Sequence, residues 1–173
     1  LKGEGHFIAK LVNGELQSTE KKRKKKNKRK KQSIVKPDKE QVKLFNQFIT
    51  SVFPDYQPHQ LILFGDQLYD LPLEEDKIEG LNVLRPGLHL GTFKKNRFEP
   101  ALAWALASLP SEANRIIELS REQWHQYVHG DVINIDADLP NGWYLLVCDD
   151  HTTGFGKLVG KTIKNFYPKG LRF

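Results

Sequence analysis

The sequence predicts an α+β protein: a small helix-on-antiparallel-sheet module followed by a compact β-barrel. Three observations support this prediction. An amphipathic helical pattern follows Pro37, several short strand-like segments separated by Gly and Pro turns come next, and a second group of short strands with Gly-rich turns closes the chain. A chain of 173 residues can hold two small domains of this kind.

The composition indicates a globular piece of a longer cytoplasmic protein. Hydrophobic residues make up 39% of the chain, which is enough for modest cores and argues against global disorder. The chain starts at Leu1 and contains no methionine, so we expect the natural N-terminus to lie upstream. It has no apolar run of about 20 residues, as a membrane span needs, and no signal-peptide pattern. Its single cysteine, Cys148, fits a reducing compartment.

The basic charge is concentrated in one tract. Residues 21–31 read KKRKKKNKRKK, with ten basic residues and no acidic one. Outside this tract 17 basic residues face 21 acidic ones, so the net charge changes from +6 to −4. The tract is interpreted as an arm for RNA phosphates or as a linker kept extended by self-repulsion, and both can be true. A nuclear-import signal is the third interpretation.

The segment before Pro37 divides into a strand and a linker. Apolar and polar side chains alternate from Phe7 to Leu11, so residues 1–12 are expected to form a strand whose sheet lies upstream. Residues 13–36 show no apolar periodicity and are predicted to be a basic linker that contains the lysine tract.

The first module is predicted over residues 37–105. Pro37 opens a helix as far as Phe53, with acidic side chains at the positive end of its dipole. The apolar residues at three- and four-residue spacing predict one buried stripe formed by Val42, Phe45, Ile49 and Val52. Strands of an antiparallel sheet are expected at residues 60–64, 67–71, 82–85, 88–93 and 96–100.

The second module is predicted over residues 106–173. The segment 101–109, which leads into it, is expected to be a helix capped by Pro100 and too apolar to be exposed on any face. Ser120, with a glutamine three residues later, is a capping-box pattern for a short helix that Gly130 ends. Strands are expected at residues 115–119, 142–149 and 153–165.

The C-terminal residues are the most specific part of the sequence. Residues 154–172 (GFGKLVGKTIKNFYPKGLR), preceded by GWYLLVCDD at 142–150, resemble the terminal module of a bacterial branch of the Sun-type (nucleolar-protein) cytosine-5 RNA methyltransferases. This is the branch of ribosomal RNA small-subunit methyltransferase F and its relatives, and the module is similar to the PUA fold, an RNA-binding barrel. Residues 3–11 resemble the last strand of the family's methyltransferase core, and residues 85–105 (RPGLHLGTFKKNRFEPALAWA) resemble its intermediate C-terminal domain.

The resemblance implies a parent protein that methylates small-subunit ribosomal RNA with S-adenosylmethionine. The family uses two cysteines for catalysis and holds the cofactor on an open α/β sheet. In this chain the one cysteine, Cys148, lies in an apolar strand with no nearby base to lower its pKa, and no glycine-rich strand-to-helix loop is present. We therefore expect neither catalytic residues nor a cofactor site in this chain, and we expect both to lie upstream of Leu1.

A basic cluster near the C-terminus is the predicted RNA-binding site. Its lysines lie on one side of a helix, or they spread around a turn at Gly160 in a strand–turn–strand. The segment offers cations for phosphates, an amide for a base edge and aromatic rings for stacking. The predicted RNA-binding residues are Lys157, Lys161, Lys164, Asn165, Tyr167, Lys169 and Arg172. Alternatively the lysines are merely solvated, and packing in the core is the favoured interpretation for the rings of Phe166 and Tyr167.

The remaining histidines and tryptophans predict no further site. His125 and His129 have the spacing of a metal-ligand pair, but the glutamate of the zinc-protease pattern is missing between them and no third ligand is evident, so no metal site is predicted. The tryptophans fall in different predicted elements and are expected to be core or hinge residues, not a row for base stacking: Trp104, Trp124 and Trp143.

The sequence thus predicts an RNA-binding region that holds ribosomal RNA while a separate catalytic domain acts on the target cytosine. The alternative is a structural scaffold that docks on its own methyltransferase domain without direct RNA contact, and the net charge of −4 outside the tract favours it. An independent hydrolase or metal enzyme is a third hypothesis, which only the histidine pair supports.

Overall fold

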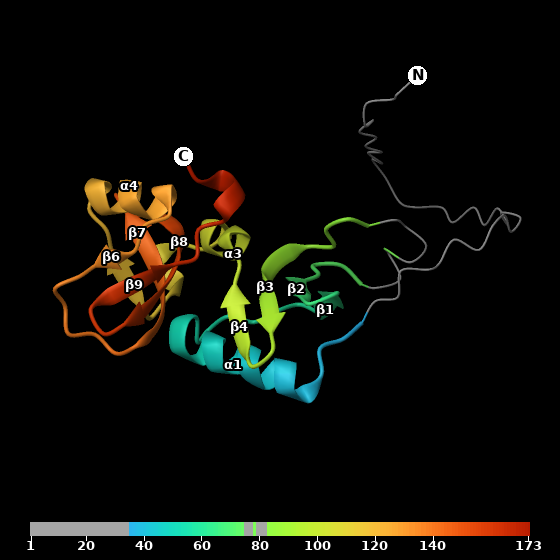
Figure 1. Cartoon of the computed structure of the whole chain (residues 1–173). Coiled ribbons are helices and arrows are strands. Elements are labelled where there is room, and N and C mark those ends of the chain that lie inside the picture. Colours follow the sequence, from blue (N-terminus) through green and yellow to red (C-terminus); the bar gives the residue numbers. More distant parts are fainter. Residues whose placement is uncertain (1–34, 75–77, 79–82) are drawn as a thin grey trace, which may run out of the picture. The chain divides into compact units, whose positions relative to one another are not determined.

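The computed structural model describes residues 35–74, 78 and 83–173, which belong to one compact unit (Figure 1). The strand predicted at residues 1–12 lies outside the described residues, and so does the predicted basic linker up to residue 34, including the lysine tract. At the end of that predicted linker, Val35 forms an isolated antiparallel bridge with Leu63, whose N–H donates to the Val35 carbonyl oxygen at 2.7 Å.

The first helix, α1 (Lys39–Val52), begins two residues after Pro37, where the sequence predicts its start. Asp38 is the N-cap: its side chain accepts a hydrogen bond from the Gln41 N–H at 2.8 Å, and the Gln41 side chain accepts one from the Asp38 N–H at 2.9 Å. This reciprocal pair satisfies two backbone donors that a helix start otherwise leaves unbonded. The predicted helix is therefore confirmed, with its start fixed by a capping box.

Four strands form the first sheet in the order β1-β2-β3-β4, with every neighbour antiparallel. They correspond to four of the five predicted strands: β1 (Leu61–Phe64), β2 (Gln67–Asp70), β3 (Leu88–Lys94) and β4 (Arg97–Pro100). The fifth prediction, at residues 82–85, is wrong where the structure describes it, because residues 83–85 form no strand. Since β2 pairs directly with β3, this connecting segment has no sheet neighbour, and Leu84 is 85% exposed.

The short helix α3 (Leu102–Ala107) corrects two predictions about the segment 101–109. Its N-cap is Ala101, because Pro100 is still the last residue of β4. The expectation of burial on every face is also wrong, since Leu106 is 60% exposed and Leu109 is 63% exposed. A helix of six residues that packs on β3 and β8 buries one side only, here Trp104 and Ala105, and leaves its other side in water.

The second sheet is mixed and curls as a half-barrel, in the order β5-β7-β8-β9-β6. The β5–β7 pairing is parallel and the other pairings are antiparallel. The strands are β5 (Ile116–Glu118), β6 (Ile133–Asn134), β7 (Gly142–Cys148), β8 (His151–Val159) and β9 (Thr162–Asn165). The segment predicted as one strand at residues 153–165 is therefore two strands joined by a turn. The two-residue strand β6 was not predicted, because no periodicity shows in so short a segment.

The helix α4 (Arg121–His129) confirms the predicted capping box. The Ser120 side chain accepts from the Gln123 N–H at 3.2 Å, and the Gln123 side chain accepts from the Ser120 N–H at 3.0 Å. Gly130 ends the helix with φ 109°, a left-handed conformation that favours glycine. Two 3₁₀ turns complete the elements: η1 (Pro110–Glu112) precedes β5, and η2 (Lys169–Leu171) follows β9 near the C-terminus.

The largest hydrophobic core joins the two sheets. It contains the buried face of α1, Trp104 of α3 and, from the second sheet, Leu145, Val147 and Phe155. On α1 the buried residues are Phe45, Phe48 and Val52, whereas Val42 and Ile49 of the predicted stripe are only partly buried. A second core fills the half-barrel between its sheet and α4. The predicted α+β class is confirmed: a helix-on-sheet module comes first, and the β-barrel expected after it is an open half-barrel of five strands.

Candidate nucleic-acid interface

The candidate interface is a row of side chains that crosses three strands of the half-barrel. The antiparallel register places Trp143 of β7 opposite Lys157 of β8, and Lys157 opposite Lys164 of β9. Residues directly opposite each other share one face of a sheet, with Cβ atoms about 5 Å apart. Of the two arrangements that the sequence left open for the lysines, the structure has the strand–turn–strand, with its turn at Gly160 and Lys161.

The cross-strand lysines carry like charges that the described residues do not neutralise. Lys164 is exposed and Lys157 is partly exposed, and neither forms an ion pair with a carboxylate in the described part of the chain. Lys157 Nζ lies 5.9 Å from the centroid of the Trp143 ring, a cation–π contact. Because like charges directly opposite each other destabilise a sheet, this pair favours an anion as its partner.

Phe166 packs on the outside of the half-barrel, against Trp143. The two ring centroids are 4.4 Å apart with an interplanar angle of 59°. Trp143 is held in turn by Phe48 of α1, at a centroid distance of 6.3 Å, and packs at the edge of the large core. Phe166 is partly exposed and belongs to none of the three core clusters formed by the described residues. Phe166 therefore packs against the half-barrel, as the favoured interpretation expects, but at its surface and with part of its side chain exposed.

Lys161 and Lys169, two other predicted RNA contacts, differ in their partners. Lys161 Nζ lies 2.7 Å from Asp136 Oδ1, and both side chains are well exposed. An exposed pair of this kind contributes at most about 1 kcal/mol, but it places a carboxylate beside any approaching phosphate. Lys169, in η2, is exposed and has no ion pair with a described carboxylate. Lys169 is therefore better placed than Lys161 to meet an anion.

The amide of Asn165, predicted to contact a base edge, makes three hydrogen bonds within the protein. Nδ2 donates to the carbonyl oxygens of Tyr127, at 2.6 Å, and of Asp131, at 2.8 Å. Oδ1 accepts from the Tyr167 N–H at 2.8 Å. These bonds tie the end of β9 to the end of α4 and to the C-terminal segment. Both amide donors are used, so the geometry favours a structural role for Asn165.

Tyr167 and Arg172 are also engaged within the protein. The Tyr167 ring meets the Tyr127 ring edge-on at a centroid distance of 5.4 Å and packs against the second core, which confirms the favoured interpretation of this ring. Arg172 donates from Nε and Nη2 to the Tyr167 carbonyl oxygen, at 3.3 and 3.2 Å. The Tyr127 hydroxyl donates to the Phe155 carbonyl oxygen at 2.9 Å, and burial raises the pKa of Tyr127. The C-terminal segment is thereby fixed against α4.

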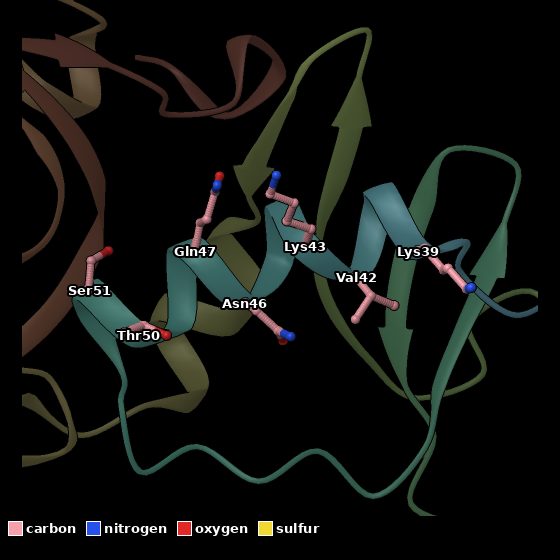
Figure 2. Close-up of a pocket in the computed structure, with 7 residues that line it drawn as sticks. All are labelled: Lys39, Val42, Lys43, Asn46, Gln47, Thr50 and Ser51. Atoms are coloured by element: carbon pink, nitrogen blue, oxygen red, sulfur yellow. The ribbon is translucent and has the colours of Figure 1, made fainter.

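A shallow groove of about 630 Å³ runs along α1 (Figure 2). Lys43, Gln47 and Ser51 extend from one side of the helix, as their four-residue spacing requires. The complete lining is Lys39, Val42, Lys43, Asn46, Gln47, Thr50 and Ser51. Since all of these residues come from one helix, the groove encloses no ligand and does not form a catalytic cleft.

The described residues do not assemble a nucleophile or a metal site. Cys148 is buried, and desolvation together with the neighbouring Asp149 carboxylate raises the pKa of its thiol, which keeps it neutral and a weak nucleophile. His129 Nδ1 lies 3.1 Å from Asp131 Oδ2 at the end of α4. Within residues 35–74, 78 and 83–173, no three His, Cys, Asp or Glu side chains are grouped so that they could hold a metal ion.

The described residues also do not fit S-adenosylmethionine. The family that the sequence resembles holds this cofactor on the open sheet of an α/β domain, at a glycine-rich strand-to-helix turn. Among the described strands, β5 and β7 form the single parallel pair, and it lies in an otherwise antiparallel half-barrel.

No described helix has the length and apolar character that crossing a bilayer requires.

Comparisons with known proteins agree with this geometry. Residues 114–173, which contain the half-barrel with Lys157 and Lys164, match the model of the methyltransferase RsmF PUA domain. Residues 47–107 match the model of the RsmF rRNA methyltransferase first C-terminal domain. A 116-residue stretch, 66% of this chain, is 28% identical to the "Ribosomal RNA small subunit methyltransferase F" of Aeromonas salmonicida (strain A449) and covers 24% of that protein.

The chain thus spans about a quarter of the length of this curated relative, and both family models describe C-terminal domains. Their order along the chain is the order that the fold shows, with the helix-on-sheet module first and the half-barrel second. The chain therefore carries an RsmF-type first C-terminal domain and an RsmF-type PUA domain, and it is distantly similar to ribosomal RNA small subunit methyltransferase F.

Proposed function

We propose that this chain binds small-subunit ribosomal RNA on behalf of an RNA (cytosine-5) methyltransferase and positions the target for the catalytic domain of the parent protein. The observation that carries the proposal is the cross-strand pair of Lys157 and Lys164, two like charges that lack a described carboxylate partner. The membership of the half-barrel in a PUA family of rRNA methyltransferases supports RNA as the anion.

The proposed contacts are to phosphates. Lys157, Lys164 and Lys169 meet the RNA backbone, whereas Asn165, Tyr167 and Arg172 hold the C-terminal segment in place. Phosphate contacts set affinity and register without reading sequence, which suits a domain that orients RNA for another domain. Residues 21–31 would add sequence-independent attraction. The division proposed along the chain is a last core strand (1–12), a basic linker (13–36), the intermediate domain (37–105) and the RNA-binding domain (106–173).

Methyl transfer itself is assigned to the catalytic domain of the parent protein, which would hold S-adenosylmethionine. The chain alone is expected to bind no S-adenosylmethionine and to methylate no RNA, because its buried Cys148 is the single cysteine and the described residues do not fit the cofactor. Isothermal titration of the chain with the cofactor tests this assignment. Stoichiometric binding would contradict it. A cytoplasmic location is part of the same proposal.

Salt dependence of RNA binding tests the phosphate contacts. In the full chain, Lys157→Gln and Lys164→Gln are each expected to weaken binding to all RNAs about equally. Each change should make the slope of log affinity against log salt shallower by about 0.7 for single strands and about 0.9 for duplexes. The lysine tract is identical in every variant, so its contribution cancels when slopes are compared. Affinities are measured by fluorescence anisotropy over a salt series.

Lys95→Gln is the matched control, because Lys95 is exposed in the turn between β3 and β4, in the other sheet. It should leave the slope unchanged. The scaffold alternative, in which this region docks on the methyltransferase domain without touching RNA, makes a different prediction. In that case the slopes of Lys157→Gln, Lys164→Gln and Lys95→Gln would all equal that of the unmodified chain, and the proposed function would be wrong.

A further inference from the structure

Phe166 is a large apolar side chain for which the fold gives no core position. It is partly exposed, packs on Trp143 at a centroid distance of 4.4 Å and joins no core cluster of the described residues. The next residue, Tyr167, turns the other way and packs against the second core. Alternation along an extended chain therefore places Phe166 on the face that carries Trp143, Lys157 and Lys164, at the edge of the region where this face packs in the large core.

The ring of Phe166 has one aromatic support. It meets the Trp143 ring at an interplanar angle of 59°, and Trp143 in turn contacts Phe48 of α1 at a centroid distance of 6.3 Å and an interplanar angle of 72°. On its other side the chain is anchored by Asn165, whose Oδ1 accepts from the Tyr167 N–H at 2.8 Å. An aromatic side chain fixed before binding loses little conformational entropy when a flat ligand stacks on it.

We propose that the Phe166 ring, supported by Trp143, is a stacking platform for one unpaired RNA base, whose flanking phosphates meet Lys157 and Lys164. The proposal rests on the proposed function, and it adds the ligand class: an unpaired nucleotide in a loop, bulge or single strand. The chemistry is that of a π face beside cations. A base offers its own flat face for stacking, and its backbone offers a phosphate on each side.

The geometry favours an unpaired base over a duplex. In a helical duplex both faces of each base are covered by neighbours, so a duplex can meet the lysines but cannot stack on Phe166. An unstacked base can do both. Stacking is tolerant of base identity because every base has a π face. The Asn165 amide, which could have contacted a base edge, already makes three internal hydrogen bonds. The platform is therefore expected to accept any base with modest preference.

Substitutions at Phe166 in the full chain test the platform. The probe is a short single-stranded RNA with one fluorescent adenine analogue whose emission is quenched when it stacks. Phe166→Leu keeps an apolar side chain but removes the π face, and it should weaken single-strand binding by at least about fivefold, the lower end of the effect per stacked base. It should also abolish the quenching and leave the salt slope unchanged. Phe166→Tyr keeps the π face and should retain both affinity and quenching.

Phe173→Leu is the matched control, since Phe173 is 74% exposed and borders a hollow beside α4 whose lining includes neither Trp143 nor a lysine. It should change nothing. A duplex of the same composition is the second control, and Phe166→Leu should leave its affinity within about twofold of the unmodified chain. Thermal melts check that the variants fold, which is expected because Phe166 lies outside the cores.

The outcomes separate this inference from the proposed function. If Lys157→Gln and Lys164→Gln reduce the salt slope but Phe166→Leu leaves single-strand affinity and quenching intact, the platform is wrong and the phosphate contacts stand. If Phe166→Leu weakens duplex and single strand equally, the ring acts by shaping the surface and the stacking inference is again wrong. If no substitution has an effect, both proposals fail.

Discussion

Replacing Asn165 with alanine should destabilise the fold by about 2–3 kcal/mol. The change removes three hydrogen bonds, two donated to the carbonyl oxygens of Tyr127 and Asp131 and one accepted from the Tyr167 N–H. Each such bond contributes about 0.5–1.5 kcal/mol net. The cost depends on whether the abandoned partner can bind water: Tyr127 is buried, whereas Asp131 is exposed. The Tyr127 carbonyl oxygen keeps its bond from the Gly130 N–H at 3.1 Å, so losing the Asn165 donor should cost more there than at Asp131 but less than a fully unpaired acceptor would.

Urea unfolding followed by circular dichroism measures this loss as a shift of the midpoint at constant m-value. The salt slope of RNA binding should stay unchanged, because no charge is removed. If the midpoint shift corresponds to less than about 0.5 kcal/mol while discrimination between RNA sequences is lost, Asn165 contacts a base edge and the structural interpretation is refuted.

The isosteric change Asn165→Asp sharpens the test. The carboxylate can still accept from the Tyr167 N–H, but it faces the two carbonyl oxygens without a donor, so it should destabilise the fold more than alanine does at pH 7. Protonation restores one donor. The carboxyl pKa in the folded state should therefore be raised above its ordinary value, and the variant should regain stability as pH falls through that raised pKa to the ordinary value of an aspartate in the unfolded chain. If the variant does not regain stability relative to alanine at low pH, the hydrogen-bond assignment is wrong.

Three further predictions concern stability. Asp70→Ala should cost about 3 kcal/mol in urea unfolding, because the buried carboxylate accepts from the Tyr56 hydroxyl at 2.8 Å and from the His59 N–H at 2.9 Å, and an intact midpoint would contradict this. Asp150→Gly should raise the melting temperature by about 2–4 °C, because Asp150 has a left-handed φ of 62° that glycine adopts without strain, and a lower melting temperature would show that its side chain stabilises the turn. Burial lowers the pKa of His89, so the unfolded chain binds the proton first as pH falls below about 6.5, and stability is lost from there down to the lowered pKa. His89→Gln should therefore make the free energy of unfolding less dependent on pH across that window, which urea midpoints at several pH values would measure.

Local signals in the sequence located most of the elements correctly. The capping box at Ser120 and the glycine at 130 fixed α4 to the residue, because both act within one turn of helix. The turn at Gly65 and Asp66 likewise separates β1 from β2 as predicted. The errors occurred where neighbours in space decide. The segment at 83–85 is not a strand, because β2 and β3 already pair with each other, and Leu106 is exposed, because α3 packs on one side only.

The candidate interface shows the same contrast between local sequence signals and neighbours in space. By itself the sequence determined that lysines, an amide and aromatic rings cluster between residues 157 and 172, and that the chain resembles an RNA methyltransferase family. Only the tertiary structure decided which of them are available to a ligand. The register made Lys157 and Lys164 neighbours, whereas Lys161 met Asp136, 25 positions away.

The fold also decided which polar and aromatic groups were used internally. The Asn165 amide donates to carbonyl oxygens more than 30 positions earlier in the chain, and the Phe166 ring packs on the Trp143 ring. Side-chain type and spacing along the chain are local properties, and they determine secondary structure and the chemistry on offer. Charge neutralisation, hydrogen bonding and exposure depend on partners distant in sequence, which no local pattern encodes.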